Sequence, residues 1–172
     1  MLRFGGKTLI EHVVDNVLAS RVAETVVVIG HDANAIKGVL KNRPVKLALN
    51  QNYLEGMGTS VRAAMGQVSP AAQGVLIVLG DQPGITGGVI DQVVSNFSEG
   101  KGSIIVPVHK GRRGNPVLFD IKYKSELIKL SGDVGAREVV IAHPDDVYEV
   151  DVGSEGILED IDTEQDYKRY AE

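Results

Sequence analysis

The stretch from Gly74 to Ile85 reads G-V-L-I-V-L-G-D-Q-P-G-I, and the rest of the chain is organised around it. Its five consecutive apolar residues, Val75 to Leu79, run into turn residues, a pattern that fits a parallel strand buried on both faces. Asp81 then stands at the carboxyl end of the strand, where open α/β sheets bind their ligands. Two interpretations of Asp81 stay open on this segment alone: a ligand of a divalent cation or polar substrate group, or a surface turn residue.

Composition places the chain among ordinary globular proteins. Its 172 residues are 43% hydrophobic and 24% charged. We expect residues 1–172 to form a single domain that buries roughly 70% of the unfolded chain's surface. No apolar run reaches the length of about 18 residues that spans a membrane, and no signal peptide is recognisable, so we expect a cytoplasmic protein without membrane contact. The net charge of −5 argues against affinity for nucleic acid, and the lack of Cys excludes thiolate chemistry.

Helical and strand patterns alternate along the chain. The patterns predict helices over residues 8–18, 32–40, 57–68, 89–97, 125–130 and 133–142, and a last helix from residue 163. They predict strands over residues 25–29, 45–49, 75–79, 103–108, 116–119 and 147–152. The alternation predicts an α/β fold whose sheet is mostly parallel and covered by helices on both faces. Because the chain opens with a helix, the pattern lacks its first strand.

A glycine-rich stretch follows the second predicted strand. Residues 50–62 read N-Q-N-Y-L-E-G-M-G-T-S-V-R, in which Gly56 and Gly58 allow the backbone to turn closely around a ligand. Thr59 and Ser60 place hydroxyl and N–H groups at a helix start, which suits anions or base edges. The alternative is an ordinary loop that ends in a helix cap.

Three further polar stretches have both a functional and a structural interpretation. Residues 110–116, K-G-R-R-G-N-P, supply cations for a phosphate group or form a solvated hairpin tip. Residues 131–137, S-G-D-V-G-A-R, place Asp133 as a helix N-cap and Arg137 one turn later, a stabilising pair without any ligand. Residues 159–162, E-D-I-D, offer carboxylates to Mg²⁺ or complement the dipole of the helix that follows. The four His residues show no paired metal-ligand spacing.

Taken in order, six stretches resemble the molybdenum cofactor cytidylyltransferase family of nucleotidyltransferases. They are F-G-G-K-T-L-I-E-H at 4–12, E-G-M-G-T-S-V-R at 55–62, L-G-D-Q-P at 79–83, R-R-G-N-P-V-L-F at 112–119, G-D-V-G-A-R at 132–137 and D-I-D-T-E-Q-D-Y at 160–167. The resemblance implies a Rossmann-like three-layer α/β/α fold. It also implies that a molybdopterin-type phosphate acceptor attacks the α-phosphate of CTP or GTP, with Mg²⁺ as cofactor and pyrophosphate as the leaving group.

The same resemblance implies roles for individual residues. The catalytic metal ligands would be Asp81 and Asp162. The base and ribose contacts would be Asn50, Gly58, Thr59 and Ser60. The acceptor contacts would be Gly114, Asn115, Asp133 and Arg137. Many family members have His where Asn115 stands, a departure that bears on any proton-transfer role at this position.

A second departure lies at the amino end. Family members begin with a strand and a signature loop resembling L-A-A-G-x-S-x-R-M-G, which holds the triphosphate, whereas residues 1–6 read M-L-R-F-G-G. Either the chain is truncated relative to its natural product, or it is a catalytically inactive module that binds a nucleotide or pterin and serves a partner protein. A sheet without that strand would leave an open edge, which favours association into a homo-oligomer.

Overall fold

The computed structural model describes residues 3–4, 6–161 and 166. The chain divides into two compact units, each assembled from segments that are distant in sequence. The first unit comprises Met1–Ala23, Leu76–Leu118 and Tyr148–Glu172, and the second comprises Glu24–Val75 and Phe119–Val147. Within the described part of the chain, no helix is both long enough and apolar enough to span a membrane.

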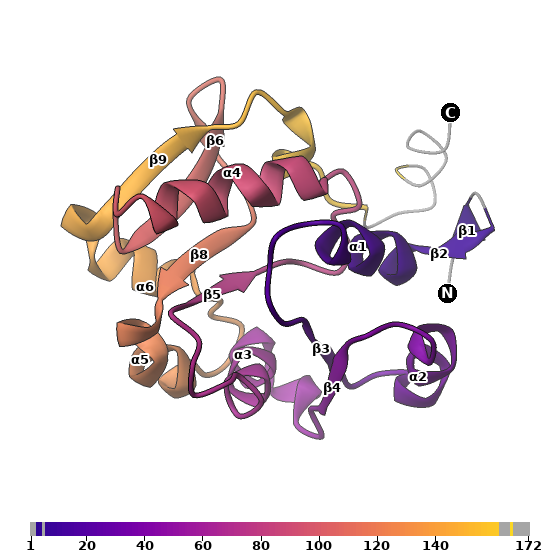
Figure 1. The fold of residues 1–172 in the computed structure, drawn as a ribbon. Helices are drawn as coiled ribbons and strands as arrows, with labels where there is room; N and C mark the ends of the chain where they lie inside the picture. The colour runs from indigo at the N-terminus through magenta and orange to yellow at the C-terminus, as the bar shows by residue number, and fades with distance from the viewer. Residues whose placement is uncertain (1–2, 5, 162–165, 167–172) are drawn as a thin grey trace. The chain divides into compact units, whose positions relative to one another are not determined.

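Strands and helices alternate along the described residues, as the sequence predicts (Figure 1). The strands are β1 (Arg3–Phe4), β2 (Lys7–Thr8), β3 (Val26–Ile29), β4 (Lys46–Leu49), β5 (Gly74–Ile77), β6 (Ile104–His109), β7 (Arg112–Arg113), β8 (Val117–Asp120) and β9 (Val147–Asp151). The helices are α1 (Leu9–Leu18), α2 (Ala33–Leu40), α3 (Met57–Met65), α4 (Gly87–Ser98), α5 (Lys124–Lys129) and α6 (Arg137–Ala142). Short 3₁₀ turns are η1 (Tyr53–Glu55), η2 (Ile121–Tyr123), η3 (Pro144–Asp146) and η4 (Glu155–Leu158). The predicted last helix begins at Thr163, which lies outside the described residues.

The described strands hydrogen-bond in three groups. β1 and β2 form an antiparallel hairpin, and β3 pairs with β4 in the parallel arrangement expected of an α/β fold. The five-stranded sheet has the order β5-β8-β6-β7, and β9 also pairs with β6. β6 and β7 are antiparallel around Lys110 and Gly111, which both have positive φ. The hairpin interpretation of the K-G-R-R stretch is therefore confirmed.

β5 differs from its prediction in length and burial. The strand ends at Ile77 instead of Leu79, and residues 74–79 are half-buried instead of buried on both faces. β5 is last in the order of its sheet, so β8 is its one partner among the described strands. An apolar run reports the tendency to form a strand, but it does not report whether that strand lies at the edge of its sheet.

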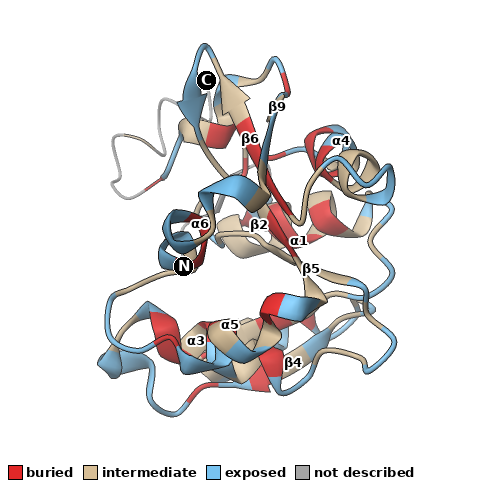
Figure 2. Ribbon diagram, turned by 90° about the vertical axis from the view of Figure 1, so that its left-hand side faces the viewer, coloured by how far each residue is buried: buried red, intermediate tan, exposed pale blue. Residues whose placement is uncertain are grey.

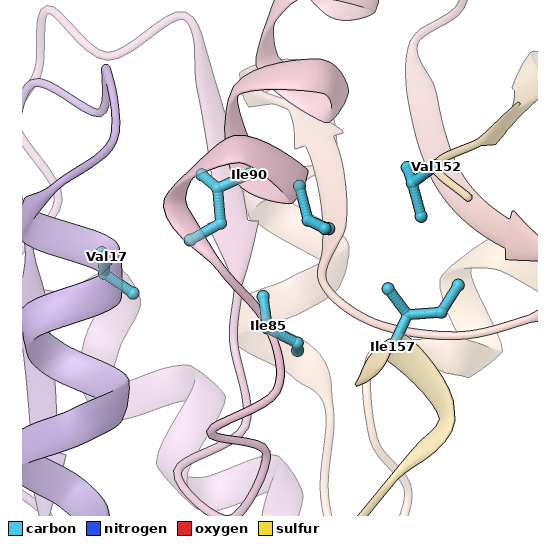
Figure 3. Packing of buried hydrophobic residues seen from close by; sticks show 6 residues of the cluster. Val17, Ile85, Ile90, Val152 and Ile157 are labelled. Carbon is cyan, nitrogen blue, oxygen red and sulfur yellow. The ribbon is translucent and has the colours of Figure 1, made fainter. Parts of the chain in front are cut away.

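The core of the first unit gathers around α4 and the turn that leads into it. Ile85 and Ile90 lie close to Val17 of α1 and to Ile157 of η4 (Figure 3). Ile90 and Ile157 are completely buried, and the buried residues of α4 and β6 are red in Figure 2. α1 begins with the predicted capping box, in which the N–H of Thr8 donates to the Glu11 carboxylate at 2.8 Å. Burial of Ile157 holds η4 against this core.

The second unit packs α3 against α5 and the β3–β4 pair. Ile29 of β3, Met65 of α3 and Leu127 of α5 are at most 1% exposed. These side chains come from three elements that are far apart in sequence, so the unit has a core of its own. The start of α3, where the predicted nucleotide loop ends, is held by that core.

α6 begins later than predicted. The pattern placed a helix over residues 133–142 with Asp133 as its N-cap, but α6 starts at Arg137 and follows Ala136. Gly132 adopts φ +64°, and its carbonyl accepts a hydrogen bond from the N–H of Gly58 at 3.0 Å. Because this bond ties the loop to α3, residues 132–136 do not wind into the helix. Asp133 is therefore an exposed loop residue and not a helix cap.

Candidate functional site

The turn after β5 carries Asp81, the first predicted metal ligand. The backbone carbonyl of Asp81 accepts a hydrogen bond from the N–H of Ile161 at 2.9 Å, and the carboxylate oxygen Oδ1 of Asp81 is buried. At the other end of the turn, Nδ2 of Asn16 in α1 donates to the carbonyl of Pro83 at 2.9 Å. The turn is thus held at both ends, and one of these contacts brings Asp81 to the segment that precedes Asp162.

Asp162, the second predicted metal ligand, lies outside the described residues. Its neighbour in sequence, Ile161, is the residue bonded to the Asp81 backbone. Among the side chains that the structure describes, no group of three or more His, Cys, Asp or Glu gathers to hold a metal ion. A Mg²⁺ site commonly uses one or two protein carboxylates together with waters and substrate phosphates, so a larger cluster is not required.

Gln82, next to Asp81, is an unusually buried polar residue. Gln82 is 2% exposed, and its Nε2 donates a hydrogen bond to Oδ1 of Asp160. The Oε1 of the same amide is buried and has no hydrogen-bond partner among the described residues. Buried polar atoms in native proteins nearly always find a partner, so an exception calls for an explanation such as a water or an ion.

The polar atoms of this turn fit a hard divalent cation. Oδ1 of Asp81 and Oε1 of Gln82 are both buried oxygen acceptors and belong to adjacent residues. Carboxylate, carbonyl and water oxygens are the ligands that Mg²⁺ and Mn²⁺ prefer. The residues present therefore suit the kind of cation that the sequence predicts.

Gly114 and Asn115, predicted on the acceptor side, lie beside η4 in the first unit. The N–H of Asn115 donates to the carbonyl of Ile157 at 3.0 Å, and the N–H of Gly114 donates to the carbonyl of Pro107 at 2.9 Å. A Cβ atom at Gly114 would lie 2.2 Å from the carbonyl oxygen of Ile157, so a larger residue would force the two backbones apart. The peptide bond between Asn115 and Pro116 is cis.

The chain from Gly156 to Ile161 also contacts the turn after β5. A Cβ atom at Gly156 would lie 2.5 Å from the carbonyl oxygen of Gly84, which shows how closely the two backbones approach. Ile161 then bonds to Asp81 as described above. Within the first unit, one short segment therefore contacts both the predicted metal turn and two of the predicted acceptor residues.

The predicted nucleotide-binding residues lie in the second unit, between β4 and α3. Asn50 is 5% exposed, and its Nδ2 donates to Oγ1 of Thr59 at 2.9 Å and to Oγ of Ser60 at 3.0 Å. Its Oδ1 accepts from the N–H of Asn52 at 3.0 Å. The Thr59 hydroxyl is within 2.8 Å of the Gly56 carbonyl, to which it donates. The structure brings these residues together, and their side-chain polar atoms bond mainly to one another.

Gly58 connects this network to the S-G-D-V-G-A-R loop. Besides donating to the carbonyl of Gly132, it packs so closely that a Cβ atom would lie 2.6 Å from the backbone nitrogen of Ser131. Asp133 and Arg137 follow this contact, and both are exposed. The predicted nucleotide loop and one predicted acceptor loop therefore pack directly, while the other two predicted acceptor residues belong to the first unit.

A pocket of about 490 Å³ opens beside the Asn50 network. It is lined by Leu49, Asn50, Gln51, Asn52, Thr59, Arg62 and Ala63. Its volume lies within the range of roughly 300–1,000 Å³ that small-molecule sites occupy. Arg62 was not predicted as a site residue. Its signal in the sequence was the spacing of three residues from Thr59, which places both side chains on one face of α3.

An acidic residue with one buried carboxylate oxygen follows β5, and a glycine-rich loop leads into α3 beside a pocket, both of which are expected of an α/β nucleotidyltransferase. The chain belongs to the family of the MobA-like NTP transferase domain, whose sequence model matches residues 1–147. The prediction of a nucleotidyltransferase is therefore confirmed at the level of the family. The narrower assignment to molybdenum cofactor cytidylyltransferases stays a proposal.

Solved structures of similar fold support the α/β assignment. Rv0371c from Mycobacterium tuberculosis H37Rv, solved in complex with manganese, is 24% identical with a TM-score of 0.85, and the match covers 98% of this chain and 88% of that one. The 4-diphosphocytidyl-2C-methyl-D-erythritol synthase of Anaerococcus prevotii DSM 20548 is 16% identical with a TM-score of 0.80, over 98% of this chain and 86% of that one. These similarities confirm the Rossmann-like nucleotidyltransferase fold.

Two relatives are similar in sequence. Nicotine blue oxidoreductase of Paenarthrobacter nicotinovorans is 28% identical over 176 residues, which cover 98% of this chain and 85% of the relative. The bifunctional protein GlmU of Halalkalibacterium halodurans is 42% identical over 95 residues, which cover 55% of this chain. The matched region is 20% of the length of GlmU, so the similarity concerns one part of that protein.

Proposed function

We propose that the chain is a nucleotidyltransferase that transfers CMP from CTP to a molybdopterin-type phosphorylated acceptor. A phosphate oxygen of the acceptor bonds to the α-phosphorus, the bond from that phosphorus to the oxygen bridging to the β-phosphate breaks, and pyrophosphate leaves. One observation carries the proposal. The hydrogen bond from the N–H of Ile161 to the Asp81 carbonyl joins the acidic E-D-I-D segment to the turn that carries Asp81, whose Oδ1 is buried.

Transfer of this kind needs alignment of the reactants and neutralisation of developing negative charge more than covalent help from the protein. Asp81 and Asp162 would hold Mg²⁺, which when bound supplies positive charge to the phosphate oxygens. The manganese complex of Rv0371c supports a divalent cation, and the diphosphocytidyl synthase of A. prevotii supports a cytidine nucleotide. Location in the cytoplasm and association into a homo-oligomer stay predictions.

The loops described above would form two binding sides, one for the nucleotide and one for the acceptor. The base and ribose would be held by the Asn50, Gly58, Thr59 and Ser60 region beside the 490 Å³ pocket. The acceptor would be held by Gly114, Asn115, Asp133 and Arg137. Because the polar atoms of Asn50 and Thr59 bond within the loop, we expect their role to be shaping the pocket, while Arg62 and backbone groups contact the nucleotide.

Release of pyrophosphate tests this function directly. The chain is incubated with Mg²⁺, a molybdopterin acceptor, and CTP or GTP, and pyrophosphate is expected only with both substrates and more rapidly with CTP. Asp81→Asn is expected to lower kcat by at least about 100-fold, the usual loss when transition-state charge is no longer stabilised. Asp145→Asn, which changes an exposed carboxylate of the second unit, is the matched control and should leave kcat unchanged.

Full activity of Asp81→Asn would refute the assignment of this carboxylate. Binding of CTP in calorimetry without release of pyrophosphate under any condition would instead support a catalytically inactive nucleotide-binding module.

The similarity to nicotine blue oxidoreductase favours a second candidate function, an oxidoreductase. The visible absorbance of nicotine blue, followed in the presence of a reductant, distinguishes the two functions. Under our proposal the absorbance does not change. An oxidoreductase would change it without needing Mg²⁺, and Asp81→Asn would not remove that activity.

A further inference from the structure

We propose that Gln82 is a positioning residue of the metal site: its Nε2 holds Asp160, and its buried Oε1 accepts a hydrogen bond from a water molecule of a hydrated divalent cation. The inference rests on the proposed function, because it concerns the cation that Asp81 and Asp162 would hold. It adds a residue that acts through the water shell of the cation and does not itself bind the metal.

The orientation of the Gln82 amide is fixed by its one partner. An ionised carboxylate offers only acceptors, so the NH₂ end of the amide must face Asp160. The reversed amide would place two oxygens against each other. Oε1 therefore faces away from Asp160, and no described residue donates to it.

The backbone of the turn keeps the side chain in this position. The residues on either side of Gln82 are both tied down, Asp81 by the N–H of Ile161 and Pro83 by Nδ2 of Asn16. Gln82 is 2% exposed, so Oε1 cannot reach bulk water without breaking the bond to Asp160. A bound ligand would supply the donor that no described residue supplies.

The chemistry beside Gln82 indicates what that donor is. The adjacent Asp81 carboxylate attracts cations, and Mg²⁺ bound by one or two carboxylates keeps several of its waters. Those waters are strong donors, and residues that bind the first ligand shell commonly change metal affinity by about 10- to 100-fold when they are mutated. A hydrated divalent cation thus supplies both the charge that suits Asp81 and the donor that suits Gln82.

A purely structural role for Gln82 predicts a different result. If the amide only pinned Asp160, the buried and unsatisfied Oε1 would lower stability, and an apolar residue of similar shape would relieve that loss. Cation affinity would then not depend on residue 82. Gln82→Leu removes Oε1 together with the bond to Asp160, whereas Asp160→Ala removes that bond alone, so a larger loss of cation affinity in Gln82→Leu separates the two roles.

The experiment measures Mn²⁺ binding by calorimetry and thermal unfolding without metal, on the full chain. Gln82→Leu is expected to raise the Kd for Mn²⁺ at least about tenfold, with a melting temperature within about 3 °C of the wild type. The matched control is Gln92→Leu, the same change at an exposed position of α4 in the same unit, away from the turn. It should leave the melting temperature within about 3 °C and the Kd within about threefold of the wild type.

A second variant keeps the proposal testable if Gln82→Leu does not fold. Asp160 is exposed, so Asp160→Ala is tolerated by the core and releases the Gln82 amide. It is expected to weaken Mn²⁺ binding at least about threefold, since Oε1 is then no longer oriented. An unchanged Kd in the folded Gln82 variant, or in Asp160→Ala when only that variant folds, overturns the proposal.

The Asp81→Asn variant separates this inference from the proposed function. If the wild type binds Mn²⁺, Asp81→Asn does not, and Gln82→Leu binds like the wild type, the role of Gln82 is wrong and the metal assignment stands. If the wild type does not bind Mn²⁺, or Asp81→Asn binds it equally well, both the role of Gln82 and the assignment of the metal site to Asp81 are wrong.

Discussion

Asn50 in the second unit and Gln82 in the first are buried side chains that end in the same chemical group and are used differently. Asn50 is 5% exposed and uses both ends of its amide: Nδ2 donates to two hydroxyls, and Oδ1 accepts from Asn52. Gln82 is 2% exposed and uses one end, the bond to Asp160. Its Oε1 has no partner among the described residues. Residue type and burial alone therefore do not distinguish these two amides, whereas the hydrogen bonds at their two ends do.

The difference has a consequence for how each region would meet a ligand. A loop whose polar side chains bond to one another is rigid before a ligand arrives, and rigidity lowers the entropy lost on binding. A turn with an unsatisfied buried acceptor is instead stabilised by the ligand that satisfies it. We therefore expect the Asn50 loop to govern the stability of the second unit, and the Gln82 turn to govern affinity for a cation.

The largest expected effect comes from the glycine that holds the Asn50 loop in place. In Gly58→Ala the new Cβ meets backbone atoms of Ser131 and Leu130 at 2.6–2.7 Å, which cannot move aside as a flexible side chain would. We expect a loss of at least about 2 kcal/mol in the free energy of unfolding, measured with urea. Gly38→Ala is the control, because the exposed Gly38 of α2 has nothing within 4 Å of its added Cβ.

Gly38→Ala should raise the free energy of unfolding by about 0.5–1 kcal/mol, since Ala is the better helix former. If Gly58→Ala were as stable as Gly38→Ala, the close packing of the nucleotide loop on the S-G-D-V-G-A-R loop would be wrong.

A smaller effect is expected from Asn50 itself. Asn50→Ala removes two donors and one acceptor from a buried network, and we expect it to cost about 1–3 kcal/mol of unfolding free energy. The matched control is Asn52→Ala, whose exposed side chain bonds to Glu55, and which should cost no more than about 0.5 kcal/mol. If the two variants were equally stable in urea unfolding, the hydrogen bonds of Asn50 would not stabilise the loop, and its contrast with the partly unpaired amide of Gln82 would be wrong.

Local sequence patterns predicted the elements well because their causes are local. The capping box of Thr8 and Glu11, the apolar face of α4 and the hairpin at Lys110 each depend on residues within a few positions of one another. The pattern failed where a distant partner decides the structure. The early end and the half-burial of β5 depend on which strands pair with it, and the late start of α6 depends on a bond from Gly58.

The candidate site shows the same limit of prediction from local sequence patterns. The sequence grouped Asn50, Thr59 and Ser60, which lie within eleven consecutive residues and prove to share hydrogen bonds. It did not single out Gln82, because the bond that orients its amide comes from Asp160, 78 positions further along the chain. Whether a buried polar atom is satisfied is a property of the folded chain, and no spacing or composition records it.

The smallest expected effect concerns Tyr123, a third buried polar side chain. Its hydroxyl group, like the amide of Asn50, has a hydrogen-bond partner within the protein. Tyr123 is 3% exposed and donates to the Asp146 carboxylate. Burial is the largest cause that raises the pKa of the Tyr123 hydroxyl, and the hydrogen bond to Asp146 is the second. The hydrogen bond from Tyr123 is the largest cause that lowers the pKa of Asp146, and the hydrogen bond from Lys122 is the second.

These two pKa shifts make the free energy of unfolding depend on pH in two opposite ways. The lowered pKa of Asp146 contributes stability that is present above about pH 4, the ordinary value for Asp, and is lost as the pH falls through the folded value. The raised pKa of Tyr123 contributes stability that is present below about pH 10 and is lost as the pH rises toward its folded value.

Tyr123→Phe should flatten both dependences, because Asp146 then titrates closer to its ordinary pKa and no phenol remains to ionise. The measurements are the urea midpoint between about pH 2 and pH 11, which brackets both ordinary values, and the NMR titration of the Asp146 carboxyl group. Lys122→Met is the comparison, since Lys122 is the second cause of the shift and lies 3.3 Å from the same carboxylate oxygen. A larger rise in the Asp146 pKa in Lys122→Met than in Tyr123→Phe would show that charge, and not the buried hydroxyl, holds this carboxylate ionised.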